Sequence, residues 1–326
     1  MANGKFVISL DFEMYWGVRD VVKLGDYKEH LLGVHKAIPD LLEAFSQYKV
    51  NATFATVGFL FFSSKRELIQ NIPKKIPHYT NEDLSPYAGN FKLVGEDETV
   101  DPFHFGNSLI QKIKNAGQEI GSHTFSHYYC LEKGQTKEDF IADIIAAKKV
   151  ARDNNIQLSS FVFPRNQYNE EYLDICKELG FTSFRGNERS KLFSSKSQGN
   201  ATFLRRPFRL LDSYINLSGH NCYTDNEMRE NDPINIPSSR FLRPYSKRLK
   251  SFEKLRLKRI TNSMSYAAKH GQTYHLWRHP HNFVTDVQEN FEFLNRVLSH
   301  FQKLNTAFPF ESRRMRPLAD ELRKSR

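Results

Sequence analysis

The chain has 326 residues, 39% of them hydrophobic, which is enough for one large core. It contains no apolar run near the roughly 20 residues of a membrane-spanning helix, and its first residues lack the layout of a signal peptide, so we expect a cytoplasmic protein. The net charge of +10 favours acidic partners, but the absence of a nucleic-acid-binding motif argues against nucleic acid, and three scattered cysteines argue against a disulfide framework.

Predicted strands and helices alternate along the chain. Apolar runs predict strands at 5–10, 51–57, 119–122, 159–163, 181–184, 208–211 and 273–277. Apolar residues at helical spacing predict helices at 31–48, 59–70, 107–116, 136–152, 169–179, 246–269 and 286–304. Such alternation predicts a parallel sheet with right-handed crossovers. Because the length suits a single domain and no glycine-rich dinucleotide motif is present, we expect a closed or nearly closed barrel.

We expect one barrel domain over residues 1–310, with long insertions at 71–103 and 186–246, and a basic C-terminal tail over 311–326. The predicted helix 246–269 is strongly basic. Its apolar residues approximate one stripe, formed by Leu249, Phe252, Leu255, Leu257 and Ile260. Two interpretations stay open: a barrel helix with its apolar face inward, or peripheral contact with a membrane surface.

Two acids follow the first predicted strand, at a place where reacting groups gather in parallel barrels. Asp11 and Glu13 project to the same side of an extended chain, while Phe12 points away. Acids that end a buried strand need a partner, because burying an unpaired charge is costly. We therefore expect both carboxylates to face the barrel axis.

A histidine pair follows the predicted strand 119–122. The four-residue spacing of His123 and His127 would place both imidazoles on one face of a helical turn. Two histidines and one carboxylate, Glu13, leave positions open on a divalent metal for water and substrate. The sequence therefore predicts a metal site, most simply for Zn²⁺, held by these three residues.

Further polar residues follow two other predicted strands. Asp11, free of the metal, suits a general base that takes a proton from water. Arg165 follows the strand 159–163, where its guanidinium would orient Asp11 and keep it ionised. His279 follows the last strand and is the candidate general acid for the leaving amine, with His281 as an orienting neighbour or an alternative acid.

Four ordered stretches resemble the motifs of polysaccharide deacetylases (NodB-homology domain, carbohydrate esterase family 4). They are SLDFE at 9–13, SHTFSH at 122–127, FPR at 163–165 and LWRHPH at 276–281. FSHYYCLE at 125–132 and FPRNQ at 163–167 resemble members from bacterial O-antigen and capsule biosynthesis clusters in particular. The resemblance spans residues 5–300. It implies a distorted, TIM-like (β/α)7 barrel and a metal-dependent hydrolase that removes an N-acyl group, usually acetyl, from an amino sugar.

Carried over by position, the resemblance implies that Asp11 is the catalytic base, Arg165 its tether and His279 the acid, with His123 and His127 as metal ligands. The chain departs from the family pattern in two places. Phe12 stands where many members have a metal-binding aspartate, so that Glu13 would take this role. Asn166-Gln167-Tyr168 replaces the usual tail of the arginine motif, which bears on substrate preference.

The basic surface suits a phosphate tail or an anionic membrane, so we expect an amino-sugar substrate linked to a nucleotide or lipid diphosphate. Tyr15, Trp16 and Tyr128 lie beside the motifs and either stack on the sugar ring or pack in the core, and Asn166 and His281 complete the predicted substrate contacts. Two alternatives stay open: an N-deformylase or cyclic-amide hydrolase with the same site, and a non-catalytic carbohydrate-binding protein, for which Phe12 is the argument.

Overall fold

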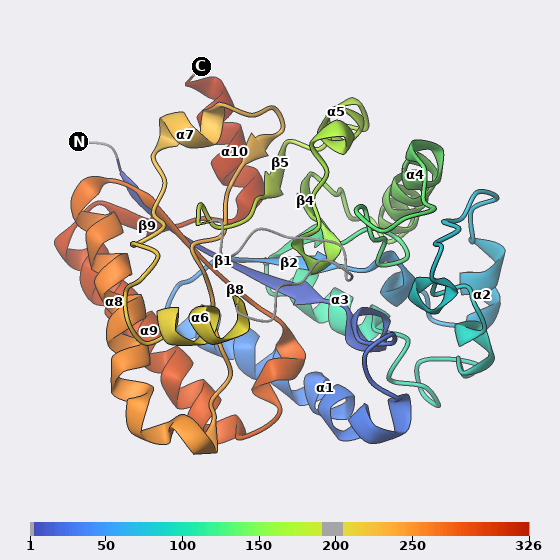
Figure 1. The fold of residues 1–326 in the computed structure, drawn as a ribbon, viewed down its shortest axis with the longest axis horizontal. Coiled ribbons are helices and arrows are strands. Elements are labelled where there is room, and N and C mark those ends of the chain that lie inside the picture. The colour runs from blue at the N-terminus through green and yellow to red at the C-terminus, as the bar shows by residue number, and fades with distance from the viewer. Residues whose placement is uncertain (1–2, 191–204, 326) are drawn as a thin grey trace.

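The computed structural model describes residues 3–190 and 205–325, built around a sheet of parallel strands (Figure 1). The strand order is β6-β5-β4-β3-β2-β1-β8-β7, and β9 pairs with β1. The strands are β1 (Gly4–Phe12), β2 (Ala52–Thr56), β3 (Glu119–Ser122), β4 (Ser160–Val162), β5 (Ser183–Arg185), β6 (Ile234–Asn235), β7 (Arg240–Phe241), β8 (Thr273–Arg278) and β9 (Phe310–Ser312).

Helices surround the sheet, with α8 and α9 on one side of β1 and α3 and α4 on the other (Figure 1). They are α1 (Leu24–Gln47), α2 (Lys65–Gln70), α3 (Asn107–Asn115), α4 (Lys137–Asp153), α5 (Leu173–Glu178), α6 (Arg205–Asp212), α7 (Asp225–Arg229), α8 (Glu253–His270), α9 (Val287–Ala307) and α10 (Met315–Lys324). No helix in the described part of the chain combines the length and the apolarity needed to cross a membrane.

The extended segment 234–242 joins the two edges of the sheet. Its first half pairs with β5, where the Ile236 N–H donates to the Phe184 carbonyl at 2.9 Å. Its second half pairs with β8, where the Ser239 N–H donates to the His275 carbonyl at 2.8 Å. Because β6 and β7 are two halves of one segment, the ring has seven strand positions, and the expected (β/α)7 barrel is confirmed.

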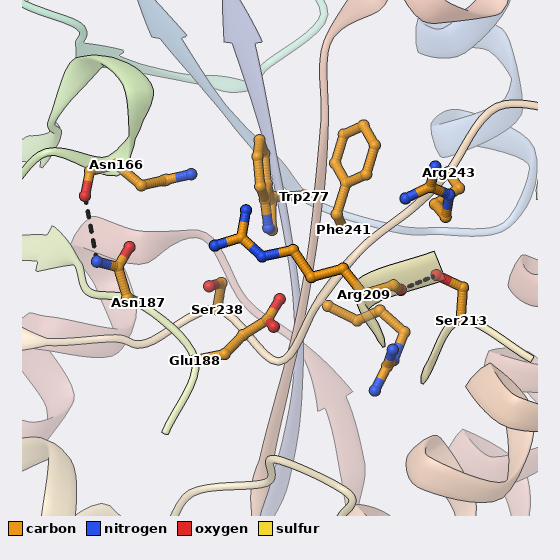
Figure 2. Close-up of a pocket in the computed structure, with 10 residues that line it drawn as sticks. Asn166, Asn187, Glu188, Arg209, Ser213, Ser238, Phe241, Arg243 and Trp277 are labelled. Atoms are coloured by element: carbon orange, nitrogen blue, oxygen red, sulfur yellow. Dashed lines mark hydrogen bonds between the residues drawn. The ribbon is translucent and has the colours of Figure 1, made fainter. Parts of the chain in front are cut away.

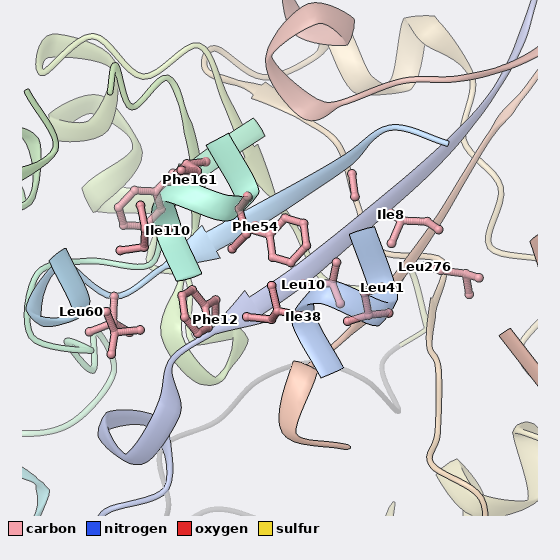
Figure 3. Close-up of a cluster of buried hydrophobic side chains, with 14 of the residues drawn as sticks. Ile8, Leu10, Phe12, Ile38, Leu41, Phe54, Leu60, Ile110, Phe161 and Leu276 are labelled. Atoms are coloured by element: carbon pink, nitrogen blue, oxygen red, sulfur yellow. The ribbon is translucent and has the colours of Figure 1, made fainter. Parts of the chain in front are cut away.

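Strand β1 shows how the barrel separates its core from its site. All nine of its residues are buried, as expected for a parallel strand covered on both faces. Ile8, Leu10 and Phe12 point outward into the hydrophobic layer under α1 (Figure 3). Ser9 and Asp11 alternate with them and project to the barrel interior. Phe12 therefore belongs to the core, and Asp11 is available to the site.

Most helices lie where the sequence predicts them. Thr136 caps α4 through a capping box with Asp139, as its sequence indicates. The predicted strand 208–211 is wrong, because these residues lie in α6. The strand that completes the barrel lies instead at 234–241, where Pro233 and Pro237 obscure the strand pattern.

Two predictions about the basic segments are corrected. The expected tail 311–326 is not a tail, because β9 pairs with β1 and α10 buries an apolar face that includes Leu318 and Leu322. The predicted helix 246–269 is divided into a 3-10 helix, Lys247–Phe252, and α8. Its apolar residues do not share one face, since Ile260 is buried while Phe252 is about half exposed.

Candidate active site

Glu13, His123 and His127 meet beyond the carboxyl ends of β1 and β3. One ligand atom from each lies within 4.8 Å of the others, and all three side chains are buried. The Nε2 atoms of His123 and His127 lie 3.4 Å and 3.1 Å from the same oxygen, Glu13 Oε2. Two imidazole nitrogens and one carboxylate oxygen around a common point form a donor set suited to a divalent cation.

The histidine pair lies in a loop, and the expectation of a helical turn is wrong. His127 has a φ of 58° and Thr124 a φ of 63°, so the backbone passes twice through the left-handed region. Asp143 of α4 holds this loop by accepting hydrogen bonds from the backbone N–H groups of Phe125 and Ser126, at 2.6 Å and 3.1 Å. A tertiary contact therefore brings the two rings together.

The protonation of His123 fits a metal ligand. Its Nδ1 donates to the Val162 carbonyl at 2.9 Å, which leaves Nε2 as the nitrogen with a free lone pair. That Nε2 is buried and has no hydrogen-bond partner among the described residues. Burial lowers the pKa of His127 to about 4, so this second ring is neutral at pH 7. The residues present therefore fit a bound cation.

Arg19 opposes ligation by His127. Its Nη1 lies 3.4 Å from His127 Nδ1, and a guanidinium can only donate hydrogen bonds. The contact thus places the ring proton on Nε2, toward Glu13. Ligation through Nε2 requires that proton to leave, so we expect His127 to be a weaker ligand than His123.

The arginine that holds Asp11 is Arg185, at the end of β5, and the prediction of Arg165 is wrong. Nη1 and Nη2 of Arg185 contact Oδ1 and Oδ2 of Asp11 at 2.7 Å and 2.8 Å in a bidentate ion pair. Burial alone would raise the pKa of Asp11, but the Arg185 charge, helped by His123 and His279, holds it below its ordinary value. Asp11 is therefore an ionised carboxylate fixed at both oxygens.

Arg165 is diverted by the shape of the turn that follows β4. Arg165 and Asn166 have φ values of 54° and 53°, and this left-handed turn separates their side chains. Arg165 forms an ion pair with Asp20 and lies 4.4 Å from the centre of the Tyr129 ring. Asn166 instead accepts a hydrogen bond from Arg185 at 2.8 Å.

His279 lies beside Asp11 and Glu13, and these three titratable side chains are the acid–base group. The Nε2 of His279 lies 3.8 Å from Asp11 Oδ2 and 3.5 Å from Glu13 Oε1, and its side chain is 22% exposed. The His281 ring stacks against it with the ring centres 5.0 Å apart. Burial lowers the pKa of His281 to about 3. His281 is thus a neutral, buried neighbour of His279, and its contact with substrate stays a prediction.

The aromatic residues predicted to stack on a sugar belong to the core. Trp16 is fully buried, and its Nε1 donates to the His104 carbonyl at 2.8 Å. Tyr128 is equally buried and donates through its hydroxyl to Gln135 at 2.6 Å. Tyr15 is 3% exposed. The partner of Trp16 lies 88 residues away in the sequence, so the local motif could not reveal this packing.

A pocket of about 210 Å³ adjoins the acid–base group (Figure 2). Its lining residues come from several barrel loops and from α6: Asn166, Asn187, Glu188, Arg209, Ser213, Ser238, Arg240, Phe241, Arg243 and Trp277. Trp277 forms the boundary with the site, because its ring lies 4.5 Å from the Arg185 guanidinium and 5.6 Å from the His279 ring. Of the predicted substrate contacts, only Asn166 lines this pocket.

Sequence reasoning missed Arg185, although the signal for it was present. The predicted strand 181–184 ends one residue before Arg185, so this arginine occupies the strand-end position that singled out Asp11 and His123. Applying the same rule to every strand would have given three candidate arginines, Arg165, Arg185 and Arg278. Only the structure distinguishes Arg185, because Arg165 pairs with Asp20 and Arg278 donates to Asn282 and Asn290.

Comparison with known proteins gives a family match for part of the chain and shared folds. Residues 27–184 match the family model described as polysaccharide deacetylase, whereas no curated protein matches the sequence. Among solved structures, one described as a polysaccharide deacetylase from Mycobacterium smegmatis is similar with a TM-score of 0.63 and 12% identity, over 100% of this chain and 92% of that one.

Two further structures share the fold. One is described as a polysaccharide deacetylase from Pseudomonas aeruginosa PAO1, with a TM-score of 0.58 and 10% identity over 98% of this chain and 91% of that one. The other is Puue allantoinase, with a TM-score of 0.56 and 8% identity over 97% and 89%. Residues 27–184 are thus similar to the polysaccharide deacetylase family, and the chain shares the barrel fold of these solved structures.

Proposed function

We propose that this protein is a metal-dependent hydrolase that removes an N-acyl group, in the first place acetyl, from an amino sugar during bacterial surface polysaccharide (O-antigen) synthesis. One observation carries the proposal: the group Glu13, His123 and His127 lies beside an ionised carboxylate, Asp11, that Arg185 holds at both oxygens. The match of residues 27–184 to the polysaccharide deacetylase family model supports the reaction class.

Glu13, His123 and His127 would hold the cation, and their two nitrogens and one oxygen suit Zn²⁺. When bound, such a cation polarises an amide carbonyl and lowers the pKa of water. Burial opposes ionisation of Glu13, but the nearby His279, His123 and His127 hold its pKa well below the ordinary value. Glu13 is therefore an anion. It is already in the deprotonated form that binds a metal.

Asp11 acts as the general base in this proposal. Arg185 holds the carboxylate ionised, so it can accept a proton from the attacking water, and the bidentate contact fixes the direction of its oxygens. His279 is the general acid. It is the partly exposed imidazole beside both carboxylates, and it donates a proton to the leaving nitrogen as the amide C–N bond breaks.

We further propose that the protein works in the cytoplasm, at the inner face of the membrane, on a nucleotide- or lipid-linked sugar. Phe252 and Leu255 are exposed at the start of α8, beside the exposed Lys254 and Lys258. Exposed apolar side chains among cations suit an anionic bilayer surface. Co-sedimentation with anionic liposomes that persists after Lys254→Glu and Lys258→Glu would exclude this contact.

The proposed function is tested by metal analysis together with a screen for acyl release. The purified protein is expected to contain about one divalent cation per chain and to release acetate from an N-acetylated amino sugar. Release of formate instead would indicate a deformylase, and a ring-opened product a cyclic-amide hydrolase. Bound metal without acyl release from any substrate would identify a non-catalytic member of the family.

Asp11→Asn separates the base from the ligands. Because Asp11 lies outside the ligand group, the variant is expected to keep its metal and to lose about 10²- to 10⁴-fold in kcat. Asp153→Asn on the exposed face of α4 is the matched control, with no change expected in either quantity. Loss of metal from Asp11→Asn, together with its retention in His123→Ala, would contradict the assigned roles.

A further inference from the structure

The pocket beside the active site carries a strong positive charge, which the reaction itself does not require. Arg209 of α6, Arg240 of β7 and Arg243 line it together, and Glu188 is the only acidic residue among its described lining residues (Figure 2). Burial raises the pKa of Glu188 to about 8 against the pull of Arg240, so Glu188 is protonated at pH 7. Asp212 offsets the charge of Arg240 at 2.8 Å, so the net positive charge of the lining comes from Arg209 and Arg243.

Two of the buried side chains have unused hydrogen-bonding capacity. Arg240 is 3% exposed and engages Asp212 through Nη1 alone, at 2.8 Å, while its Nε and Nη2 have no partner among the described residues. Glu188 is 7% exposed, and its Oε2 is likewise without a partner in the described part of the chain. Buried polar atoms normally have partners, so these atoms indicate a pocket built for a polar ligand.

The pocket and the acid–base group share a wall, so one substrate can occupy both. Arg185 donates to Asn166, which lines the pocket, and stacks on Trp277, which also lines it. Phe241, whose ring centre is 4.7 Å from that of Trp277, lies 6.1 Å from the His279 ring. The cavity of about 210 Å³ is several times the roughly 30 Å³ of one water, which leaves room for a phosphate group.

The arrangement of the arginines selects among possible anions. A single carboxylate is satisfied by one bidentate arginine, as Asp11 is by Arg185. A phosphate ester presents oxygens in several directions and suits guanidinium groups that approach from different elements. We infer that this pocket binds a phosphate or diphosphate ester on the amino sugar, an inference that rests on the proposed deacylase function.

Binding of pyrophosphate tests the pocket without any catalytic turnover. Calorimetric titration of the full-length protein compares wild type with Arg209→Gln and Arg243→Gln. Arg248→Gln is the matched control, because Arg248 is exposed on the neighbouring 3-10 helix and outside the pocket. The loss of one charge-assisted contact is expected to raise the Kd roughly tenfold or more in each pocket variant and to leave the control unchanged. An unchanged Kd in both pocket variants overturns the inference.

A kinetic comparison then tests whether the bound phosphate belongs to the substrate. Acyl release is measured from N-acetylglucosamine, its 1-phosphate, its UDP conjugate and its undecaprenyl diphosphate conjugate in detergent. Both pocket variants are expected to lose roughly tenfold or more in kcat/KM on a phosphorylated substrate, with little change on the free sugar. Equal losses on free and phosphorylated sugars overturn the inference.

The same assay distinguishes a nucleotide carrier from a lipid carrier. It also tests the deacylase function separately from the phosphate pocket. Selective loss on the UDP conjugate supports the pocket with a nucleotide carrier, and selective loss on the undecaprenyl conjugate supports it with a lipid carrier. If wild type releases no acyl group from any of these sugars, the proposed function fails on this panel. The pyrophosphate titration still decides whether the pocket binds the anion.

Discussion

Two buried glutamates, Glu13 after β1 and Glu119 at the start of β3, show how a site differs from a structural polar cluster. Both carboxylate oxygens of Glu119 accept hydrogen bonds, including those from Thr53 at 2.8 Å and Ser160 at 2.6 Å. Glu13 lies at the carboxyl end of β1 and faces imidazole nitrogens directed at the same oxygen. Both are buried, so burial alone does not identify a site.

The pKa directions report the same difference. Burial raises the pKa of Glu119, and its hydrogen bonds only partly offset this. Burial acts in the same direction on Glu13, yet the surrounding histidines lower its pKa well below the ordinary value. The region around Glu13 stabilises a localised negative charge, whereas the region around Glu119 stabilises a packed arrangement of chains.

The largest expected effect comes from neutralising each glutamate in turn. Glu13→Gln removes the charge and one ligand oxygen, and we expect most of the bound metal and at least about 10²-fold in kcat/KM to be lost. Glu119→Gln is expected to retain metal and activity. Metal content and acyl release of both purified variants make the test. Loss of metal from the Glu119→Gln variant would contradict the distinction between Glu13 as a metal ligand and Glu119 as a structural residue.

Replacing Arg185 and Arg165 in turn tests which arginine is the functional partner of Asp11. Arg185→Lys replaces a bidentate guanidinium with a point charge, and we expect roughly 10- to 100-fold lower kcat with the metal retained. Arg165→Lys is the matched variant and is expected to change kcat less than about threefold, because Arg165 pairs with Asp20. If the two kcat values fell in the reverse order, Arg165 would be the functional partner of Asp11.

A smaller effect on metal binding is expected at Gly17, whose lack of a side chain leaves space for Glu13. A Cβ atom at Gly17 would lie 2.0 Å from Glu13 Cδ, so Gly17→Ala must displace the carboxylate. We expect roughly tenfold weaker metal binding, measured by competition with a chelator. Gly25→Ala in the first turn of α1 meets no atom within 4 Å and serves as the control. Equal affinity in the two variants would show that Glu13 does not bind the metal.

The smallest effect concerns the stability that Glu119 contributes. A raised native pKa means that the folded protein binds the proton more tightly than the unfolded chain. The contribution is therefore fully present below the ordinary value of 4.5 and is lost as the pH rises through the native pKa. Relative to Glu119→Gln, wild type should lose unfolding free energy as the pH rises through this range, measured by urea denaturation at several pH values. A constant difference would contradict this sign.

The sequence by itself determined much of the site. Polar residues placed directly after apolar runs identified Asp11, Glu13, His123 and His279, because the carboxyl ends of parallel strands converge on one side of a barrel. The structure brings these four together beside His127. Alternation along β1 likewise assigned Phe12 to the core, since successive side chains of a strand face opposite sides.

Only the tertiary structure decided which groups pair across the barrel. Arg185 reaches Asp11 from a strand 174 residues away, and Asp143 holds the histidine loop from α4. The segment 234–242 closes the ring through backbone hydrogen bonds. Its sequence pattern, interrupted by Pro237, does not predict them. The local pattern of apolar and polar residues predicts whether a side chain is buried. The partner of a buried polar group depends instead on the register of elements distant in the sequence.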